Sequence, residues 1–217
     1  MPAAETPSPA ARPPRLYLAS RSPRRRALLA DAGIEHEPIS TGVDDADLNP
    51  GPVKPEQWAA ALAYLKARAG ADAAGSSGDT HEFTVLGADT ICIKDGAMIG
   101  QPRDAGDARR ILRLLSGGGH DVVTGIAIVS GAGTRRDIFV DRAGVRVGEL
   151  GEARIDRYVA SDQWRGKAGA YNLAERLADG WPIEYDGDPG TIMGLPMRAL
   201  ARRLPGARPL APVGGDA

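Results

Sequence analysis

The most informative stretch for the fold is Leu16-Tyr17-Leu18-Ala19-Ser20-Arg21-Ser22-Pro23-Arg24-Arg25. Its first residues are mostly apolar and predict a short strand over residues 16–20. Ser22 is placed to cap a helix with its hydroxyl, and Pro23 suits the first helical position, where no backbone N–H is needed. We therefore predict a strand, a tight polar loop and a helix over residues 23–32.

The start of this helix is a candidate anion site. Free N–H groups and the positive end of the helix dipole face the loop there, yet Arg24 and Arg25 lie in the first turn, where cations are disfavoured. A bound anion reverses that penalty, because it interacts favourably with both the helix end and the guanidinium groups. The motif therefore predicts a phosphate site.

Composition narrows the class of protein. The chain has 217 residues and a formal net charge of −1, so no overall basic field favours nucleic acid or an acidic membrane surface. Its single cysteine excludes an internal disulfide, its three histidines lack zinc-type spacing, and no apolar run is long enough to span a bilayer. We expect a cytoplasmic protein with a disordered leader over residues 1–14, one domain over 15–204 and a flexible tail over 205–217.

Segments typical of strands and helices alternate along the rest of the chain. Further strands are predicted at 84–94, 121–130, about 135–147 and 181–185, with a hairpin turn at Asp95-Gly96. Further helices are predicted at 55–71, from Asp104 to Leu115, at 152–160 and at 193–204, the last of them broken early by Pro196, with loops at 38–54 and 72–82. We place Trp58, Leu62 and Leu65 on the apolar face of the 55–71 helix, and we expect Gly117 to Gly119 to end the helix before them. This order predicts an α/β fold with a mixed β-sheet flanked by helices.

One acidic residue, Asp89, lies inside the otherwise apolar run Val85–Ile93. An aspartate in such a strand costs free energy unless it is paired, hydrogen-bonded or metal-bound. Two interpretations stay open: a structural aspartate satisfied by backbone amides at a strand bend beside Gly87, and a metal ligand or general base. Asp44 and Asp45 are the nearest candidates for a second carboxylate, although ordinary loop acids are the commoner case.

Two lysines are further candidates. Lys66 follows the apolar stripe of its helix, so it either extends over the core or contacts phosphate, and the local sequence favours the first. Lys167 stands among the small residues 166–170, which allow a ligand close to the backbone while the lysine supplies positive charge. Trp164 and Tyr171 either pack in the core or stack on a base. The common phosphate-loop, dinucleotide-binding and nucleophile-elbow motifs are absent.

Four motifs, taken in order, resemble those of the Maf family of nucleoside triphosphate pyrophosphatases: Ser20–Arg25, Gly87–Thr90, Lys167–Tyr171 and Gly194–Pro196. Further matches are Gln101–Asp104, Leu115–Gly117 before His120, and Tyr158–Ser161. The resemblance covers residues from about 16 to about 200. It implies the fold of the inosine triphosphate pyrophosphatases, with two lobes around a deep cleft. It also implies hydrolysis of the α–β phosphoanhydride of a nucleoside triphosphate with a divalent cation, Mg²⁺ or Mn²⁺.

The resemblance also implies roles for individual residues. Asp89 matches the family's proton acceptor and metal-site aspartate, and Asp45 matches an acidic position that shares the metal. The positions expected to bind substrate are Ser20, Arg24, Arg25, Lys66, Thr90 and Lys167, and among them Arg24 and Thr90 are linked to substrate choice.

Several positions depart from the family pattern. Gln101 stands where members often have lysine, and Gly166 where aspartate is usual. Members that prefer thymidine or uridine triphosphates carry Gly-Ile-Gln-Gly after the tyrosine, and the 7-methyl-GTP type has glutamate in place of the glutamine. Here Ala174 takes that place, with Glu175 beside it expected to point elsewhere. Because a methyl group cannot hydrogen-bond a base edge, the preferred base is left open.

Two other functions stay open. The first is a nucleotide-binding regulator, related to cell division, with little or no hydrolysis; the altered residues at 101 and 172–175 favour it slightly. The second, with less support, is a sugar-nucleotide or phosphosugar binder. Neither nucleic acid nor a membrane is an expected partner, and the oligomeric state is left open, with a homodimer among the candidates.

Overall fold

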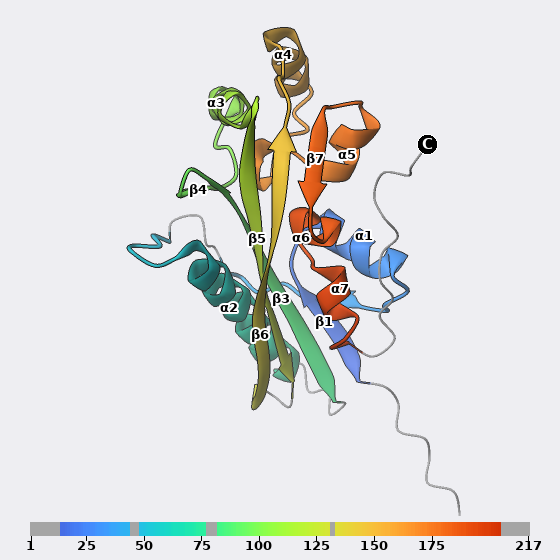
Figure 1. Cartoon of the computed structure of the whole chain (residues 1–217). Helices are drawn as coiled ribbons and strands as arrows, with labels where there is room; N and C mark the ends of the chain where they lie inside the picture. Colours follow the sequence, from blue (N-terminus) through green and yellow to red (C-terminus); the bar gives the residue numbers. More distant parts are fainter. Residues whose placement is uncertain (1–13, 44–47, 77–81, 131–132, 205–217) are drawn as a thin grey trace, which may run out of the picture.

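The sheet of this protein is mixed and strongly twisted (Figure 1). The computed structural model describes residues 14–43, 48–76, 82–130 and 133–204, so the predicted leader (apart from residue 14), the predicted tail and Asp45 lie outside the described residues. The strands are β1 (Arg15–Ala19), β2 (Glu37–Pro38), β3 (Phe83–Lys94), β4 (Ala97–Ile99), β5 (Gly118–Ser130), β6 (Arg135–Val147) and β7 (Ile183–Asp186).

Neighbouring strands follow the order β2-β1-β3-β5-β6-β7, and β4 pairs with β3. β1 is parallel to β2 and β3, whereas the other pairs are antiparallel. The predicted α/β class with a mixed sheet flanked by helices is therefore confirmed. The division into two lobes around a deep cleft stays a prediction.

The helices lie on both faces and at one end of this sheet. They are α1 (Pro23–Asp31), α2 (Pro55–Gly75), α3 (Ala105–Leu115), α4 (Glu152–Ala160), α5 (Leu173–Ala178), α6 (Pro189–Met193) and α7 (Met197–Leu200), with a 3-10 turn at Ala168–Ala170. In Figure 1, α2 covers one face, α1, α6 and α7 lie on the other, and α3, α4 and α5 gather at one end. No helix in the described ranges combines the length and the apolar character that a membrane span requires.

Two expectations about α2 are wrong. The helix continues to Gly75, so residues 72–75 are helical rather than part of a loop. Leu65 is 42% exposed, because the side of α2 that faces the sheet consists mainly of alanines, among them Ala59, Ala63, Ala67 and Ala71. A helix lined with such small side chains lies closer to a sheet than one lined with leucine, so Leu65 turns outward, whereas Leu62 is buried as predicted.

Two other boundaries differ from expectation, and one helix was missed. Gly118 and Gly119 belong to β5, and α3 before them ends at Leu115, with Ser116 as its C-cap. Met193 ends α6 instead of starting the last helix, since Gly194 adopts a left-handed φ of 108° and Pro196 follows. The helix α5 was not predicted at all, because six residues are too few for a periodic pattern to be recognised.

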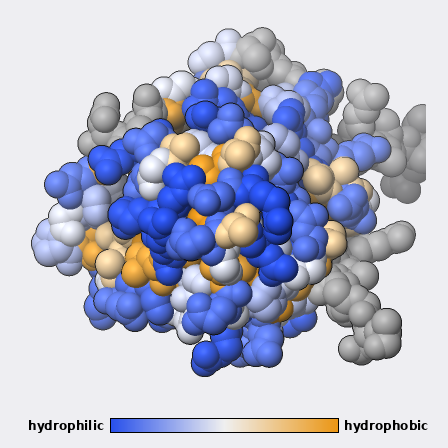
Figure 2. Space-filling view, turned by 90° about the horizontal axis from the view of Figure 1, so that it is seen from above, coloured by the Kyte–Doolittle hydropathy of each residue, from blue (hydrophilic) through white to orange (hydrophobic). Residues whose placement is uncertain are grey.

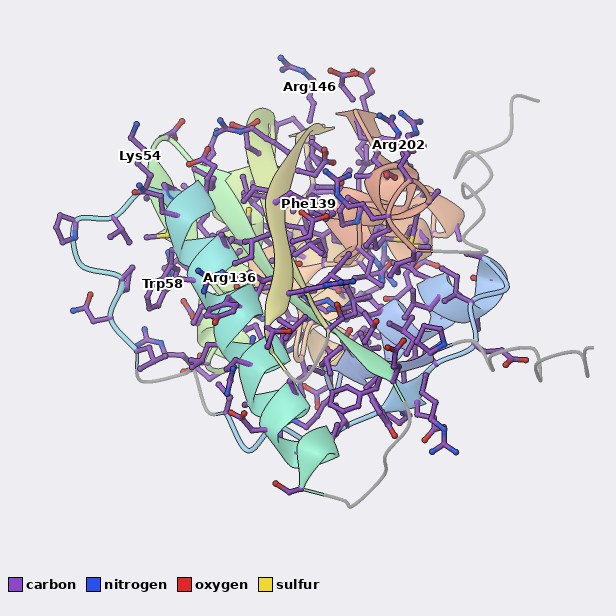
Figure 3. All side chains as sticks on the ribbon, turned by 90° about the horizontal axis from the view of Figure 1, so that it is seen from below. Lys54, Trp58, Arg136, Phe139, Arg146 and Arg202 are labelled. Carbon is purple, nitrogen blue, oxygen red and sulfur yellow. The ribbon has the colours of Figure 1, made fainter. Side chains whose placement is uncertain are left out.

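Two glycines let α2 lie close against the sheet. A Cβ at Gly87 of β3 would lie 2.3 Å from the carbonyl oxygen of Ala63, and a Cβ at Gly125 of β5 would lie 2.3 Å from the carbonyl carbon of Ala59. Asp89 is paired with Gly125 across the ladder, and side chains two apart on a strand share a face, so Asp89 also faces α2. Figure 3 shows α2 running across the sheet, with Trp58 near its start.

The apolar core has parts on both faces of the sheet. One cluster lies under α2 and includes Ala19, Ala63, Ala67, Val85 and Val129. Another lies under α1 and α7 and includes Leu18, Leu28, Leu29, Leu86 and Ile126. A third packs α3, α4 and α5 against the strands around Ile111, Leu112, Trp164 and Leu173, and it contains Cys92, which the sequence analysis also expected to be buried. At this end the surface is mainly hydrophilic, with small hydrophobic areas (Figure 2).

A buried pair of polar side chains lies beside this third cluster. His120 of β5 is 6% exposed, and its Nε2 atom lies 2.8 Å from the hydroxyl of Tyr171. Burial, and to a smaller degree the charge of Lys94, lower the pKa of His120 to about 4. Burial also raises the pKa of Tyr171. Both side chains are therefore neutral near pH 7, which suits their apolar surroundings.

We predict that Gly87→Ala lowers the free energy of unfolding by about 2 kcal/mol or more, because the new methyl group overlaps the backbone of α2. Urea denaturation measures this loss. Gly75→Ala is the matched control, since a methyl group there would meet no atom of another element within 4 Å, and alanine favours helix over glycine. Equal stability of the Gly87→Ala variant and the wild type would contradict the close packing described above.

A second prediction concerns acid stability. The pKa of a histidine in the unfolded chain is near 6.5, whereas the pKa of His120 in the folded protein is about 4. The unfolded state therefore binds more protons between these values, and the native state loses about 3 kcal/mol as the pH falls through this window. Urea denaturation of the wild type and His120→Gln between pH 7 and pH 4 should show this loss in the wild type alone. Parallel curves for the two proteins would contradict it.

Candidate active site

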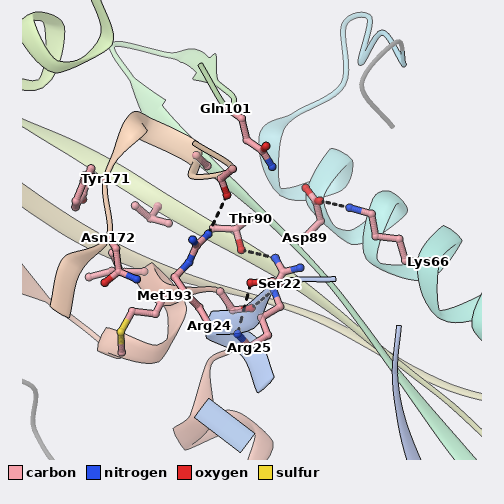
Figure 4. Close-up of a pocket in the computed structure, with 15 residues that line it drawn as sticks. Ser22, Arg24, Arg25, Lys66, Asp89, Thr90, Gln101, Tyr171, Asn172 and Met193 are labelled. Carbon is pink, nitrogen blue, oxygen red and sulfur yellow. Dashed lines mark hydrogen bonds and ion pairs between the residues drawn. The ribbon is translucent and has the colours of Figure 1, made fainter. Parts of the chain in front are cut away.

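The predicted site residues that lie within the described ranges line one hollow at the end of β1, and Figure 4 shows the inner part of this hollow. Its inner pocket has a cavity volume of about 120 Å³ and is lined by residues that include Arg24, Arg25, Lys66, Asp89 and Thr90. An adjoining outer pocket of about 740 Å³ includes Ser20, Lys167 and Glu175. Both pockets share Ser22, Arg24, Arg25, Lys66, Gln101 and Gly166, so they form one continuous space.

The hollow opens at a gap along one edge of β3. On that edge β1 pairs with residues 83–87 and β4 pairs with residues 92–94, so residues 88–91 lie between the two partners. The opposite edge of β3 is paired with β5 from Thr84 to Ile93 without a break. Side chains on both faces of β3 reach the gap, which explains how Asp89 and Thr90 line the same pocket although they point to opposite faces.

Asp89 forms an ion pair with a lysine of α2. Its Oδ1 atom lies 2.7 Å from Nζ of Lys66, and the two side chains are 13% and 16% exposed. The strand passes through Asp89 in regular register with β5, so there is no bend at Gly87 of the kind that the structural interpretation of this aspartate required. The carboxylate is thus stabilised by an ammonium group within a ligand-accessible pocket.

Arg25 joins the elements on the other side of the gap. Its guanidinium donates hydrogen bonds to Ser20 Oγ at 3.1 Å, to Ala88 O at 2.9 Å, to Thr90 Oγ1 at 2.9 Å and to Gly194 O at 2.9 Å. The residue is only 9% exposed. A planar group with five donors can tie the loop after β1, the edge of β3 and the turn after α6 together in this way, whereas a lysine cannot.

The hydrogen bond of Thr90 has a fixed direction. The hydroxyl of Thr124 donates to the carbonyl oxygen of Thr191 at 2.7 Å, so it has no second proton to give. It must therefore accept the bond of 2.9 Å that joins it to the Thr90 hydroxyl. The Thr90 hydroxyl therefore donates its proton to Thr124 and accepts a hydrogen bond from Arg25. Toward the pocket, its oxygen can accept a further hydrogen bond but cannot donate one.

Arg24 and Ser22, the N-cap of α1, line both pockets. Ser22 caps α1 as predicted, because its hydroxyl accepts from the backbone N–H of Arg25 at 3.5 Å, and Pro23 is the first helical residue. Arg24 donates from Nη2 to the carbonyl oxygen of Gly166 at 3.1 Å. Burial lowers the pKa of Arg24, although nearby Glu175 partly opposes this shift.

Lys167 is a nearly buried cation in the outer pocket. Its side chain is 9% exposed and forms an ion pair with Glu175, whose side chain is 41% exposed. Burial lowers the pKa of Lys167, and the bond to Glu175 opposes the shift. The sequence analysis missed this pair because it did not predict α5, the helix that carries Glu175 in its first turn.

The described part of the hollow has a strong excess of positive charge. The charged residues along its walls are the cations Arg21, Arg24, Arg25, Lys66, Arg165 and Lys167 and the acids Asp89 and Glu175. Such a concentration of cations in a concave site attracts anions, above all those with several charges. Trp164 is 1% exposed and so serves packing, whereas Tyr171 lines the inner pocket.

The sequence is similar to that of a known protein family and to those of several individual proteins. A family model described as Maf-like protein matches residues 15–207. The chain is 37% identical over 199 residues to a dTTP/UTP pyrophosphatase of Nitrosospira multiformis, with 88% of this chain and 93% of the relative covered. It is 38% identical over 184 residues to a protein of the same name from Hahella chejuensis, with 84% and 87% covered.

A third relative, the dTTP/UTP pyrophosphatase of Aromatoleum aromaticum, is 40% identical over 197 residues, with 88% of this chain and 94% of the relative covered. The family model spans nearly all of the described residues, and each of these relatives matches more than four fifths of the chain. The chain therefore belongs to the Maf family.

Proposed function

We propose that this chain is a nucleoside triphosphate pyrophosphatase, which hydrolyses the α–β phosphoanhydride to give a nucleoside monophosphate and pyrophosphate. One observation carries the proposal: the carboxylate of Asp89 lies in the same pocket as Arg24, Arg25 and Lys66. A proton acceptor surrounded by cations is the arrangement that attack of water on a polyphosphate requires. The names of the relatives support the same reaction.

In this proposal Asp89 takes a proton from the attacking water, whose oxygen forms a bond to the α-phosphorus. The bond from that phosphorus to the bridging oxygen breaks, and the electron pair leaves with pyrophosphate. Arg24, Lys66 and Lys167 stabilise the negative charge that grows on the leaving group. Arg25 acts mainly by holding Ser20 and Thr90 in place, since its guanidinium bonds to both.

The donors present fit a hard divalent cation. Among the described residues no group of three or more histidine, cysteine or acidic side chains could hold a metal by itself. Mg²⁺, however, is usually held by one or two carboxylates together with substrate phosphates and water. Asp89 supplies one such carboxylate, and we propose Asp45 as the second. Bound there, Mg²⁺ or Mn²⁺ would polarise the phosphate oxygens.

The base is a separate part of the proposal. Relatives are named for dTTP and UTP, so these two nucleotides are the first substrates to test. Thr90 presents only an acceptor toward the pocket, which suits an N–H group of a ligand. The methyl group of Ala174 cannot hydrogen-bond to a base edge, so a broad panel of common and modified triphosphates is needed.

We also propose that the enzyme works in the cytoplasm, where its substrates occur.

We predict that Asp89→Asn lowers the rate of pyrophosphate release at least about 100-fold, because the amide keeps the size of the side chain but cannot take a proton. A coupled pyrophosphate assay measures the loss, and thermal unfolding checks that the variant folds. Asp137→Asn is the matched control, since Asp137 pairs with Arg203 on the outside of the molecule.

Full activity of the Asp89→Asn variant would remove Asp89 from the mechanism. The assay also tests the alternative of a nucleotide-binding regulator. A wild-type protein that binds triphosphates in calorimetry but releases no pyrophosphate across the panel, with Mg²⁺ or Mn²⁺ present, would favour the regulator over the enzyme.

A further inference from the structure

Glu175 is the feature of the hollow that anion binding does not explain. Its carboxylate lines the outer pocket and pairs with Lys167, one of the cations that the proposed function assigns to the polyphosphate. An acid at this place repels the expected ligand and also occupies a cation that the ligand needs. The ion pair of Glu175 with Lys167 therefore needs an explanation other than anion binding alone.

A second cation lies behind Glu175. Arg176 Nη2 is 3.7 Å from Glu175 Oε2, the same oxygen that pairs with Lys167. The side chain of Arg176 is 5% exposed, and its guanidinium carbon lies over the rings of Tyr158 and Trp181, at 4.4 and 5.4 Å from their centres. Its Nη1 also pairs with Asp179 at 2.7 Å. Arg176 is thus a fixed positive charge that cannot follow a ligand into the pocket.

Glu175 therefore lies between a cation that faces the pocket and one that is fixed in the core. Its side chain is 41% exposed in this position, so water hydrates the carboxylate there and the side chain is not packed tightly against neighbours. The backbone of Glu175 is held independently, because its N–H donates to Asn172 Oδ1 at 3.2 Å in the cap of α5. A rotation of the side chain alone can move the carboxylate from Lys167 toward Arg176.

We propose that Glu175 competes with the substrate for Lys167: its carboxylate holds the ammonium group in the empty site, and a polyphosphate displaces it toward Arg176. This inference rests on the proposed function, because it takes polyphosphate as the ligand. Two consequences follow. The nearly buried Lys167 keeps a counter-ion when no ligand is bound. In addition, a weakly charged anion has to displace a carboxylate, so the exchange favours ligands with several negative charges.

The test uses inorganic pyrophosphate as the probe and isothermal titration calorimetry as the measurement. We expect Glu175→Gln to bind pyrophosphate about fivefold more tightly than the wild type. The reason is that the free energy of an ion pair with one nearly buried partner lies at the upper end of the range measured for exposed ion pairs. Glu184→Gln on β7 is the control for the loss of one negative charge outside both pockets, and it should bind like the wild type.

A double-mutant cycle separates displacement from simple repulsion. In the Lys167→Met background, Glu175→Gln should change the affinity less than twofold, because no ammonium remains for the two anions to share. Lys167→Gln replaces Lys167→Met if that variant does not fold. The proposal is wrong if Glu175→Gln alone fails to tighten binding, or if it tightens binding equally in both backgrounds. Failure of the proposed function would look different: the wild type would release no pyrophosphate from any triphosphate, whatever the outcome of these titrations.

Discussion

The site of this protein depends on a gap in the edge of one strand. β1 and β4 share the same edge of β3 but leave residues 88–91 between them, while β5 pairs with the other edge from Thr84 to Ile93. The strand therefore keeps its regular pairing where it carries Asp89 and Thr90. Both of its faces open toward the same hollow there, so a single strand supplies an acid from one face and a hydroxyl from the other.

Two sets of contacts hold the elements on either side of this gap in place. On one face Gly87 and Gly125 let α2 lie against the backbone of the sheet, which brings Lys66 within 2.7 Å of Asp89. On the other face Arg25 bonds to the loop after β1, to the exposed edge of β3 and to the turn after α6. Because both sets use backbone contacts or a rigid guanidinium, the charges of the site are positioned before a ligand arrives, which is the condition for electrostatic catalysis.

Two of the cations in the hollow are paired with acids. Lys66 faces Asp89, and Lys167 faces Glu175, so each of these two lysines has a carboxylate beside it. In the proposed exchange, a polyphosphate takes the place of Glu175 beside Lys167, because it carries several negative charges. The same residues can thus keep the empty site stable and still bind a highly charged ligand.

The sequence by itself determined the elements that depend on local chemistry: the cap at Ser22, the helix after it, the long strands and the order of strands and helices. Most of the charged residues that line the hollow could also be predicted from the sequence, because they lie in or near short motifs. Only the tertiary structure decided the gap beside β3, the outward position of Leu65 and the pairing of Glu175 with Lys167. The reason is physical: strand register, the distance between a helix and a sheet, and the partner of a charge arise from contacts between residues far apart in the chain, which local periodicity does not record.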